Sequence, residues 1–453
     1  MSERESGDGT PRTAGDLSTG SHKLAGVEVR RRPGRVLLKV TDGDEGPREV
    51  EAFGTRVTVG RSPVNEVRLE DGSASGTHLE LRLRPWGIAL RDLGSTNGTW
   101  IGETRVEHVW IEPGAVFKAG GCRIEILRVD EVDVPIAEET RFGDMVGSSP
   151  EMREVFAELQ RAAESGGHVL MLGGGGSGKE HAARGVHAWG ARSSGPFVVL
   201  DCASLPLAKA KAAFLGHRKG AFEGATEDTA GVLERAHGGT LFLDEIGELP
   251  MDVQDQLQTA LEHGQLRRVG DEEIRPVDVR VVAACRRDPR RLVGEGGFRE
   301  DLYFRLASPS IELPPLRERG DDPVDLALRF VRTFATECGT EKELSESAIA
   351  AIRQHDWPGN VRELKRTIKR AVHLSTGALI AVDDLRLGRG PGRDRLDDLD
   401  LFSLPPDDAR QEFERQYYRR LMAETLGDLG EAARRTSQTR DEVADALARL
   451  GLS

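Results

Sequence analysis

The sequence predicts a multidomain protein with an all-β sandwich, an α/β domain that ends in an α-helical lid, and a small all-α domain. A length of 453 residues is typical of about three domains, and 38% hydrophobic with 31% charged residues is the composition of a globular protein. The spacing of apolar residues changes twice along the chain. These changes separate the three classes of structure.

The N-terminal part is predicted to be a tail followed by a β domain. Residues 1–34 are rich in Gly, Ser, Thr and charge, which favours a disordered tail. Over residues 35–128, short apolar stretches alternate with Gly, Asp and Asn turns, as in an all-β domain. These stretches lie at residues 36–40, 56–59, 79–83, 88–90 and 122–127. The acidic residues 129–143 are predicted to form a linker.

Longer helical patterns and buried strand runs follow. The runs HVLMLG, PFVVLD, GTLFLDE and VRVVAA alternate with helical stretches and predict a parallel sheet over residues 144–316. We expect the helical lid at 317–387, a Gly, Pro and Asp linker at 388–408, and a helical tail at 409–453.

Composition limits the class of protein. The net charge of −13 opposes general attraction to nucleic acid, so any DNA contact is expected over a small local surface. Cys122, Cys202, Cys285 and Cys338 lack C-x-x-C spacing, which argues against a zinc site or a disulfide framework. The sequence shows no run of eighteen apolar residues and no apolar leader, so we expect a cytoplasmic protein.

A glycine-rich loop predicts a phosphate-binding site. The segment GGGGSGKE follows an apolar strand and precedes a helix, so its amides can cradle phosphates while Lys179 reaches the terminal ones. Taken alone, the glycines also fit a flexible turn. The candidate nucleotide-binding residues are Gly173, Gly176, Ser177, Gly178, Lys179 and Glu180.

An acidic pair strengthens this prediction. Asp244 and Glu245 end the buried strand run GTLFLDE. Asp244 can hold Mg²⁺ through water, and Glu245 can polarise a water that attacks ATP. The alternative is a structural acidic strand end.

Together with their surroundings, these motifs resemble the AAA+ domain of bacterial enhancer-binding proteins that activate sigma-54 RNA polymerase. The resemblance covers about residues 144–386 and includes GSSPEM, LGHRKGAFEGA, LFLDEIGELP, FREDLYFRL, LPPLRER and WPGNVRELK. It implies a homo-oligomeric ring ATPase using ATP and Mg²⁺, with Arg299 and Arg305 as arginine fingers acting on the neighbour and Arg362 as the sensor arginine. Taken singly, such arginines also fit surface ion pairs.

The segment GAFEGA, which lies between the two nucleotide motifs, indicates a motor that pushes on another protein. Its residues are Gly220, Ala221, Phe222, Glu223, Gly224 and Ala225. In the family this loop contacts the sigma factor and carries threonine where this chain has Glu223. The substitution adds a charge and leaves engagement of sigma-54 open.

Four further residues depart from the family pattern. Asp201 replaces an asparagine that holds the catalytic glutamate, and its carboxylate can repel Glu245. Cys285 and Arg286 replace the Thr-Asn of the first sensor, and Gly174 replaces a common glutamate. We expect ATP binding to persist, whereas turnover and its coupling to the loop stay open.

The N-terminal motifs resemble the forkhead-associated (FHA) domain, a β-sandwich that reads phosphothreonine. They are Gly60-Arg61, Ser75, His78 and DLGSTNGT at residues 92–99. Arg61 can bond to phosphate, Ser75 and Thr96 can supply hydroxyls, Asn97 can hold the peptide backbone, and His78 is expected to brace the loops. Gly76 stands where a basic residue is common, so weaker phosphate binding is expected. The alternative is a tight turn beside a surface arginine.

The tail over residues 409–453 resembles the Fis-type helix-turn-helix that closes most such activators. The candidate DNA contacts are Arg434, Arg435, Arg440 and Arg449. The expected recognition helix also carries Asp441, Glu442 and Asp445, and the turn reads Thr436-Ser437-Gln438 where a glycine is common. A dimerisation or packing hairpin is the alternative.

These features predict an ATP-dependent regulator of sigma-54 RNA polymerase that is controlled by a phosphothreonine protein and binds DNA through its tail. One alternative is an AAA+ ring that has lost sigma-54 remodelling and acts on another partner, motivated by Glu223. Another is a phosphoprotein-binding scaffold without ATP turnover, motivated by the altered sensor strand and Asp201.

Overall fold

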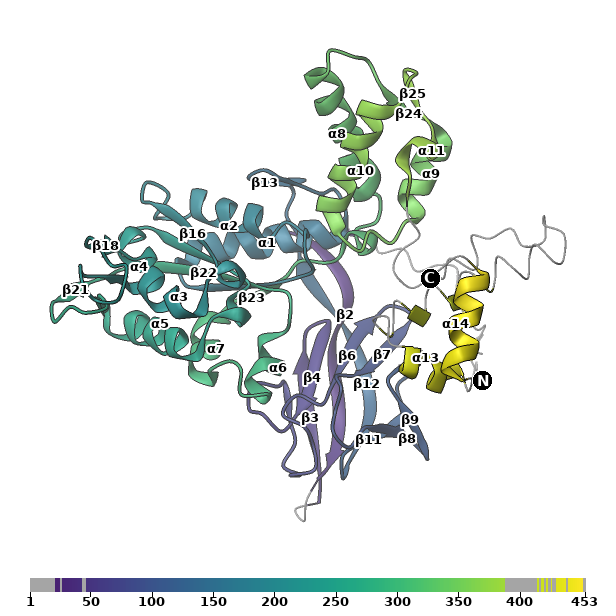
Figure 1. The fold of residues 1–453 in the computed structure, drawn as a ribbon. Coiled ribbons are helices and arrows are strands. Elements are labelled where there is room, and N and C mark those ends of the chain that lie inside the picture. Colours follow the sequence, from purple (N-terminus) through teal and green to yellow (C-terminus); the bar gives the residue numbers. More distant parts are fainter. Residues whose placement is uncertain are drawn as a thin grey trace, which may run out of the picture. The chain divides into compact units, whose positions relative to one another are not determined.

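The computed structural model describes residues 21–24, 27–42 and 46–387, and in the C-terminal segment residues 414, 417–418, 421–422, 425, 429–436 and 439–450. The chain forms two compact units, residues 1–385 and 386–453, which are described separately (Figure 1). Residues 1–20 of the predicted tail and the whole predicted second linker, 388–408, lie outside the described residues.

The first unit begins with a sandwich of two β-sheets, as predicted. One sheet has the order β1-β2-β12-β11-β8-β9 with β3 also paired to β2, and the other has the order β10-β7-β6-β4-β5. Their inward side chains, among them Leu38, Leu81 and Phe117, share one apolar core. The strands are β1 (Ser21–Leu24), β2 (Val27–Thr41), β3 (Pro47–Phe53), β4 (Arg56–Gly60), β5 (Val67–Arg68), β6 (Leu79–Arg84), β7 (Gly87–Asp92), β8 (Thr99–Ile101), β9 (Thr104–Val106), β10 (His108–Ile111), β11 (Val116–Ala119) and β12 (Cys122–Pro135).

Two predicted boundaries of this domain are wrong. Residues 21–34 contribute strand β1 and the start of β2, rather than a disordered tail. Residues 129–135 belong to strand β12, rather than to a linker. The two long strands pair as far as Pro135 opposite Val29, so backbone hydrogen bonds stabilise segments that contain few apolar residues.

Helix α1 (Pro150–Ser165) provides carboxylates that form ion pairs with the arginines of β2. Arg30 lies 2.6 Å from Glu151, and Arg32 forms a hydrogen-bonded ion pair with Glu154. Composition alone indicated disorder because these neutralising partners lie more than a hundred residues away in the sequence.

The α/β domain contains a parallel sheet of order β16-β19-β22-β15-β23, as predicted apart from β23. Its strands are β15 (Val169–Leu172), β16 (Phe197–Asp201), β19 (Thr240–Asp244), β22 (Arg280–Cys285) and β23 (Ser310–Glu312). Side chains of β19 alternate between two cores. Leu241 and Leu243 pack in a core with helices α3 (Leu207–Leu215), α5 (Met251–His263) and α7 (Glu300–Leu306). Phe242 packs in the other core with helices α1 (Pro150–Ser165) and α2 (Lys179–Ala188), and Figure 1 shows where these helices lie around the sheet. Both faces of the sheet are therefore buried.

The remaining elements of this domain surround the sheet. Its helices are α1 (Pro150–Ser165), α2 (Lys179–Ala188), α3 (Leu207–Leu215), α4 (Val232–Arg235), α5 (Met251–His263), α6 (Pro289–Gly294) and α7 (Glu300–Leu306). Short strand pairs are β13 (Arg141–Phe142) with β14 (Met145–Val146), β17 (Gly216–His217) with β18 (Thr229–Ala230), and β20 (Gln265–Arg267) with β21 (Ile274–Pro276). Short 3₁₀ helices span Cys202–Ser204, Ile246–Glu248 and Leu316–Glu318.

The predicted lid is helical. It contains α8 (Asp322–Glu337), α9 (Glu346–Gln354), α10 (Asn360–Leu374) and α11 (Val382–Leu385), with β24 (Glu343–Leu344) paired to β25 (Leu379–Ile380). The buried Trp357 anchors the turn before α10 by donating from its indole to the Ile352 carbonyl oxygen at 2.9 Å.

The second unit has a small helical core. Among its described residues are α13 (Leu429–Thr436) and α14 (Arg440–Arg449). Val443 and Leu447 of α14 pack with Ala432 and Ala433 of α13 and with Tyr418.

Two expectations from composition can be compared with the described residues. All four cysteines are free thiols, with Cys338 exposed and the other three buried. Within the described part of the chain, no helix combines the length and the apolar character needed to cross a membrane.

Candidate functional site

The glycine-rich loop connects β15 to α2. Gly173, Gly176 and Gly178 have φ values of 154°, 75° and 108°, a region of backbone space that residues with a Cβ atom rarely adopt. Gly176 has a second constraint, because a Cβ atom there would lie 2.5 Å from the Gly359 carbonyl oxygen. The loop can therefore present backbone amides at the N-terminus of α2, where phosphate is favoured.

Lys179 and the acidic pair lie beside this loop. Lys179 is 7% exposed, and its ammonium donates to the Gly173 and Gly174 carbonyl oxygens at 2.8 and 3.3 Å. Burial lowers the pKa of Lys179, while the charges of Glu245 and Asp244 oppose that shift. Burial, followed by the charge of Glu245, raises the pKa of Asp244. The cluster thus brings together a buried cation and two carboxylates that a bound phosphate and its metal would rearrange.

Glu245 is held by Arg286, a partner that the sequence did not reveal. Its carboxylate accepts from the Arg286 Nε at 2.7 Å and from the Arg286 backbone N–H at 3.2 Å. Asp201 lies opposite Asp244 in the pairing of β16 with β19, and its carboxylate accepts from the Ala203 N–H at 3.1 Å. Arg286, at the predicted first-sensor position, therefore restrains Glu245 through two hydrogen bonds. This restraint does not involve Asp201.

The lid packs directly on the phosphate loop. Asn360 donates to the Gly175 carbonyl oxygen at 3.0 Å and accepts from the Leu316 N–H at 2.8 Å. The backbone of Arg362 lies beside Gly176, where an added Cβ atom would be 3.3 Å from the Arg362 nitrogen. The predicted sensor arginine thus lies at the mouth of the loop, with an exposed side chain.

A second arginine that sequence reasoning did not single out braces the same loop. The Arg319 guanidinium is 2% exposed and donates to the Ser177 carbonyl oxygen at 2.7 Å and the Pro314 carbonyl oxygen at 2.9 Å. Burial lowers the pKa of Arg319 to about 10. Its place at the end of the run LPPLRER was a usable signal, because that run joins the sheet to the lid.

The site fits a nucleotide triphosphate. The Ser177 hydroxyl is buried without a hydrogen-bond partner, next to strained glycines and Lys179, as expected for a loop shaped to enclose a ligand. Glu180 pairs with Arg184 at 2.7 Å on the helix surface, which leaves its backbone N–H in the first turn of α2 for a phosphate. Asp244, at the end of β19, is the side chain expected to hold Mg²⁺ together with the nucleotide.

The two predicted arginine fingers lie on or beside α7. Arg299 pairs with Asp255 at 3.0 Å and Asp301 at 2.7 Å, and Arg305 donates to the Leu261 carbonyl oxygen at 3.2 Å. These contacts stay within the chain and do not involve the phosphate loop. Their action on a neighbour remains a prediction.

The aromatic loop is a compact turn between β17 and β18. Gly220 donates to the Ala225 carbonyl oxygen at 2.8 Å, and the Phe222 ring, 36% exposed, lies 4.9 Å from the His217 ring. Glu223 is exposed at the tip. The loop thus presents an aromatic ring and a carboxylate to the surface.

A second cluster of predicted residues lies at one end of the β-sandwich. Buried His78 accepts from the Ser75 N–H at 3.1 Å through Nδ1, and its Nε2 donates to the Gly98 carbonyl oxygen at 3.2 Å. Burial lowers the pKa of His78, so the ring stays neutral in this role. His78 therefore joins two loops, as predicted.

The same loops gather the proposed phosphate ligands. Arg61 is exposed, and its N–H donates to the Ser75 carbonyl oxygen at 3.0 Å. The Ser75 hydroxyl accepts from the Thr96 N–H at 3.1 Å, and the Asn97 amide donates to the Ser73 carbonyl oxygen at 2.7 Å. Arg61, Ser75, Thr96 and Asn97 therefore come together, although Asn97 is engaged in holding the loops.

The C-terminal candidates lie on the two helices of the second unit. Arg434 and Arg435 end α13, Arg440 begins α14, and Arg449 ends it, paired with Glu414 at 2.9 Å. Glu442 accepts from both the N–H and the hydroxyl of Thr439, and Thr439 accepts in return from the Glu442 N–H. This capping box explains one acidic residue of the helix without reference to DNA.

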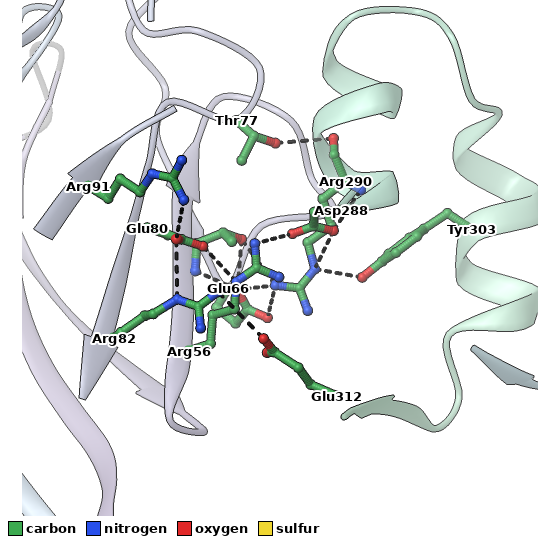
Figure 2. A network of polar contacts seen from close by, with 11 residues as sticks. Arg56, Glu66, Thr77, Glu80, Arg82, Arg91, Asp288, Arg290, Tyr303 and Glu312 are labelled. Atoms are coloured by element: carbon green, nitrogen blue, oxygen red, sulfur yellow. Dashed lines mark hydrogen bonds and ion pairs between the residues drawn. The ribbon is translucent and has the colours of Figure 1, made fainter. Parts of the chain in front are cut away.

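A polar network joins the sandwich to the α/β domain, and sequence reasoning missed it (Figure 2). Arg56 contacts Glu80 at 2.7 Å and, across the interface, Asp288 at 2.8 Å. Arg290 reaches Glu66 at 2.7 Å. Glu80 and Asp288 are 2% and 9% exposed, and the charges of Arg56 and Arg82 outweigh burial to lower the pKa of Glu80.

These features define a P-loop domain of the AAA+ ATPase class, with a lid, joined to a β-sandwich. The family comparisons agree: the sigma-54 interaction domain matches residues 145–312, the AAA+ ATPase lid domain matches 317–392, and the FHA domain matches 57–120. Over these residues the chain belongs to the AAA+ proteins that carry a sigma-54 interaction domain, and it adds an FHA domain.

Curated relatives are transcription regulators. The chain is 43% identical over 250 residues to the alginate biosynthesis transcriptional regulatory protein AlgB of Pseudomonas aeruginosa, covering 55% of this chain and 56% of that protein. It is 39% identical over 302 residues to the nitric oxide reductase transcription regulator NorR1 of Cupriavidus necator, covering 65% and 59%. The chain thus spans less than two thirds of the length of these relatives.

Solved structures extend the similarity to the fold. NtrX from Brucella abortus in complex with ATP is 29% identical and has a TM-score of 0.51, with 69% of this chain and 70% of that chain covered. The alignment supports the α/β domain and lid described above.

Proposed function

We propose that this protein is an ATP-dependent regulator of sigma-54 RNA polymerase, controlled by phosphothreonine recognition through its FHA domain. The observation that carries the motor function is the cluster of Lys179, Asp244 and Glu245 beside a phosphate loop that the lid contacts. The match to the sigma-54 interaction domain supports the choice of partner.

The chain's own residues suit hydrolysis of the γ-phosphate. ATP with Mg²⁺ would supply the phosphoryl group, Lys179 would neutralise charge on it, and Asp244 would help to hold the metal. Glu245 must leave Arg286 to orient the attacking water. Arg299 and Arg305 of a neighbouring subunit would complete the site, which requires a closed head-to-tail ring.

A transcription assay tests the motor and its partner together. We expect ATP-dependent opening of a sigma-54 promoter by the wild-type protein, and none by the Lys179→Ala variant. A protein that hydrolyses ATP but opens no promoter, while Glu223→Thr does, would instead establish a ring ATPase with another partner. Exposed Glu223 at the loop tip favours this alternative.

The scaffold alternative has its own motivation in Arg286, which holds Glu245 away from a water-activating role. A steady-state ATPase measurement separates it from both motor functions. Wild-type turnover that Glu245→Gln removes would exclude the scaffold.

Phosphothreonine control draws support from the loop cluster and from the interdomain network, because Asp288 and Arg290 follow the first-sensor residue Arg286 closely in the chain. We expect a phosphothreonine peptide to bind and Arg61→Ala to abolish binding. Equal affinity for the unphosphorylated peptide would exclude this role.

DNA binding by the second unit is the least supported part of the proposal. Neutralising Arg434, Arg435 and Arg440 together is expected to flatten the salt dependence of DNA binding, since each lost phosphate contact lowers the slope. Unchanged salt dependence would favour a packing or dimerisation hairpin.

A further inference from the structure

The phosphopeptide loops of the FHA domain do not face open solvent on every side, because α6 of the AAA+ domain lies against them. Gly76 and Gly294 meet backbone to backbone: a Cβ atom on Gly76 would lie 2.6 Å from the Gly294 Cα atom. One residue further on, the Thr77 hydroxyl donates to the Arg290 carbonyl oxygen at 3.1 Å. Figure 2 shows this hydrogen bond beside the buried ion pairs of the interface.

The contact explains why Gly76 lacks a side chain. A basic residue there would place its Cβ atom within 3.2 Å of three backbone atoms of Gly294, which cannot move without shifting α6. Docking of the two domains thus removes the cation that the FHA domain would otherwise offer from this position.

Arg291 of α6 places a guanidinium beside one of these FHA loops. Its Nη2 atom would lie 3.7 Å from a Cβ atom on Gly94, in the loop that leads to Thr96. The side chain is 48% exposed and pairs with Glu295, the residue directly after α6, with Nε and Oε1 2.7 Å apart. An exposed pair of this kind is weak, so a phosphate dianion can compete for the guanidinium.

We propose that the phosphothreonine site spans both domains, with Arg291 of the AAA+ domain supplying a second cation to a phosphate held by Arg61 of the FHA domain. The proposal rests on the proposed phosphothreonine recognition and deepens it. Guanidinium groups suit this task because their planar donors pair with phosphate oxygens in a fixed geometry.

A site that spans both domains responds to how the FHA loops pack against α6. A ligand held by Arg61 and Arg291 joins the FHA loops to α6, and α6 begins four residues after Cys285, the last residue of the first-sensor strand β22. Phosphopeptide affinity therefore depends on how α6 lies against the loops, and binding in turn restrains α6.

Fluorescence anisotropy with a labelled phosphothreonine peptide and the full chain tests the proposal. Arg291→Ala is expected to weaken binding roughly tenfold, the loss of one charge-assisted contact. The matched control is Arg184→Ala, which removes an equally exposed arginine from the i,i+4 pair with Glu180 and should leave affinity unchanged. Glu295→Gln frees Arg291 from its competitor and should tighten binding.

The outcomes separate this proposal from the one on which it rests. No phosphate-dependent binding by the wild-type chain would remove the proposed phosphothreonine recognition itself. Binding that Arg61→Ala abolishes, but that Arg291→Ala weakens no more than Arg184→Ala does, would overturn the shared site and leave FHA recognition intact. Thermal unfolding of each variant verifies that the fold is retained, as expected for exposed side chains.

Discussion

The two anion sites of this protein are built in different ways. The phosphate loop encloses its ligand with backbone amides, the buried Lys179 and a lid contact from Asn360. The FHA loops offer the exposed Arg61 and depend on packing between domains for their surroundings. In the first site, the loop and Lys179 are consecutive in the sequence, and the lid contact adds to them. The second is completed by a helix more than two hundred residues away.

The largest expected effect tests whether the nucleotide site works independently of the FHA loops. Glu245→Gln removes the charge that polarises water, so ATP turnover should fall roughly 10²- to 10⁴-fold. ATP binding and phosphothreonine binding should persist, since neither uses this carboxylate. Steady-state ATPase and peptide anisotropy measurements compare the two, and a loss of peptide affinity would show that the sites are not separate.

Breaking the ion-pair network between the FHA and AAA+ domains tests whether the FHA loops depend on packing between the two domains. Arg56→Ala leaves Glu80 and Asp288 buried with less compensation, which should cost roughly 3 to 5 kcal/mol of interface stability. Chemical denaturation with hydrogen exchange should show faster exchange in β4 and α6 and little change in the phosphate loop. The control Arg128→Ala removes an exposed pair with Asp130 and should cost less than about 1 kcal/mol. Equal effects of the two variants would contradict a structural role for the network.

The smallest effect compares one histidine in each domain, the buried His78 and the partly buried His168. His168 accepts from the Val281 N–H at 3.0 Å as His78 does from Ser75, and burial lowers the pKa of His168 to about 4. The unfolded chain takes up a proton near pH 6.5 and the folded one does not, so stability is lost as pH falls from about 6.5 towards 4. The loss should approach roughly 2 to 3 kcal/mol for His168.

Thermal unfolding at several pH values measures this loss. His168→Gln should flatten the acid dependence of the AAA+ domain, and His78→Gln that of the FHA domain. Parallel curves for variant and wild-type protein would show that carboxylates, rather than these histidines, cause the acid sensitivity.

Much of the architecture follows from local sequence. The four strand runs of the α/β domain form β15, β16, β19 and β22, because uninterrupted apolar residues suit a sheet buried on both faces. The segment GGGGSGKE similarly specifies its own site, since glycines permit the backbone angles and Lys179 follows directly.

The errors arose where the stabilising partner is distant. Residues 21–34 and 129–135 have the composition of a tail and a linker. In the structure, the first part of β2 pairs with residues 129–135 of β12, and Arg30 of β2 forms an ion pair with Glu151 of α1. Arg286 gave no local sign that it would bond to Glu245, 41 residues earlier in the chain.

The domain classes, the phosphate loop with its acidic pair, and the motifs of the FHA loops could all be predicted from local sequence patterns. The ion-pair partners, the close approach that excludes a side chain at Gly76, and the position of Arg291 beside the FHA loops became visible only in the folded chain. The difference arises from how far apart in the sequence the interacting residues lie. Backbone angles and apolar periodicity are set by neighbours in the chain, whereas ion pairing and steric exclusion depend on neighbours in space.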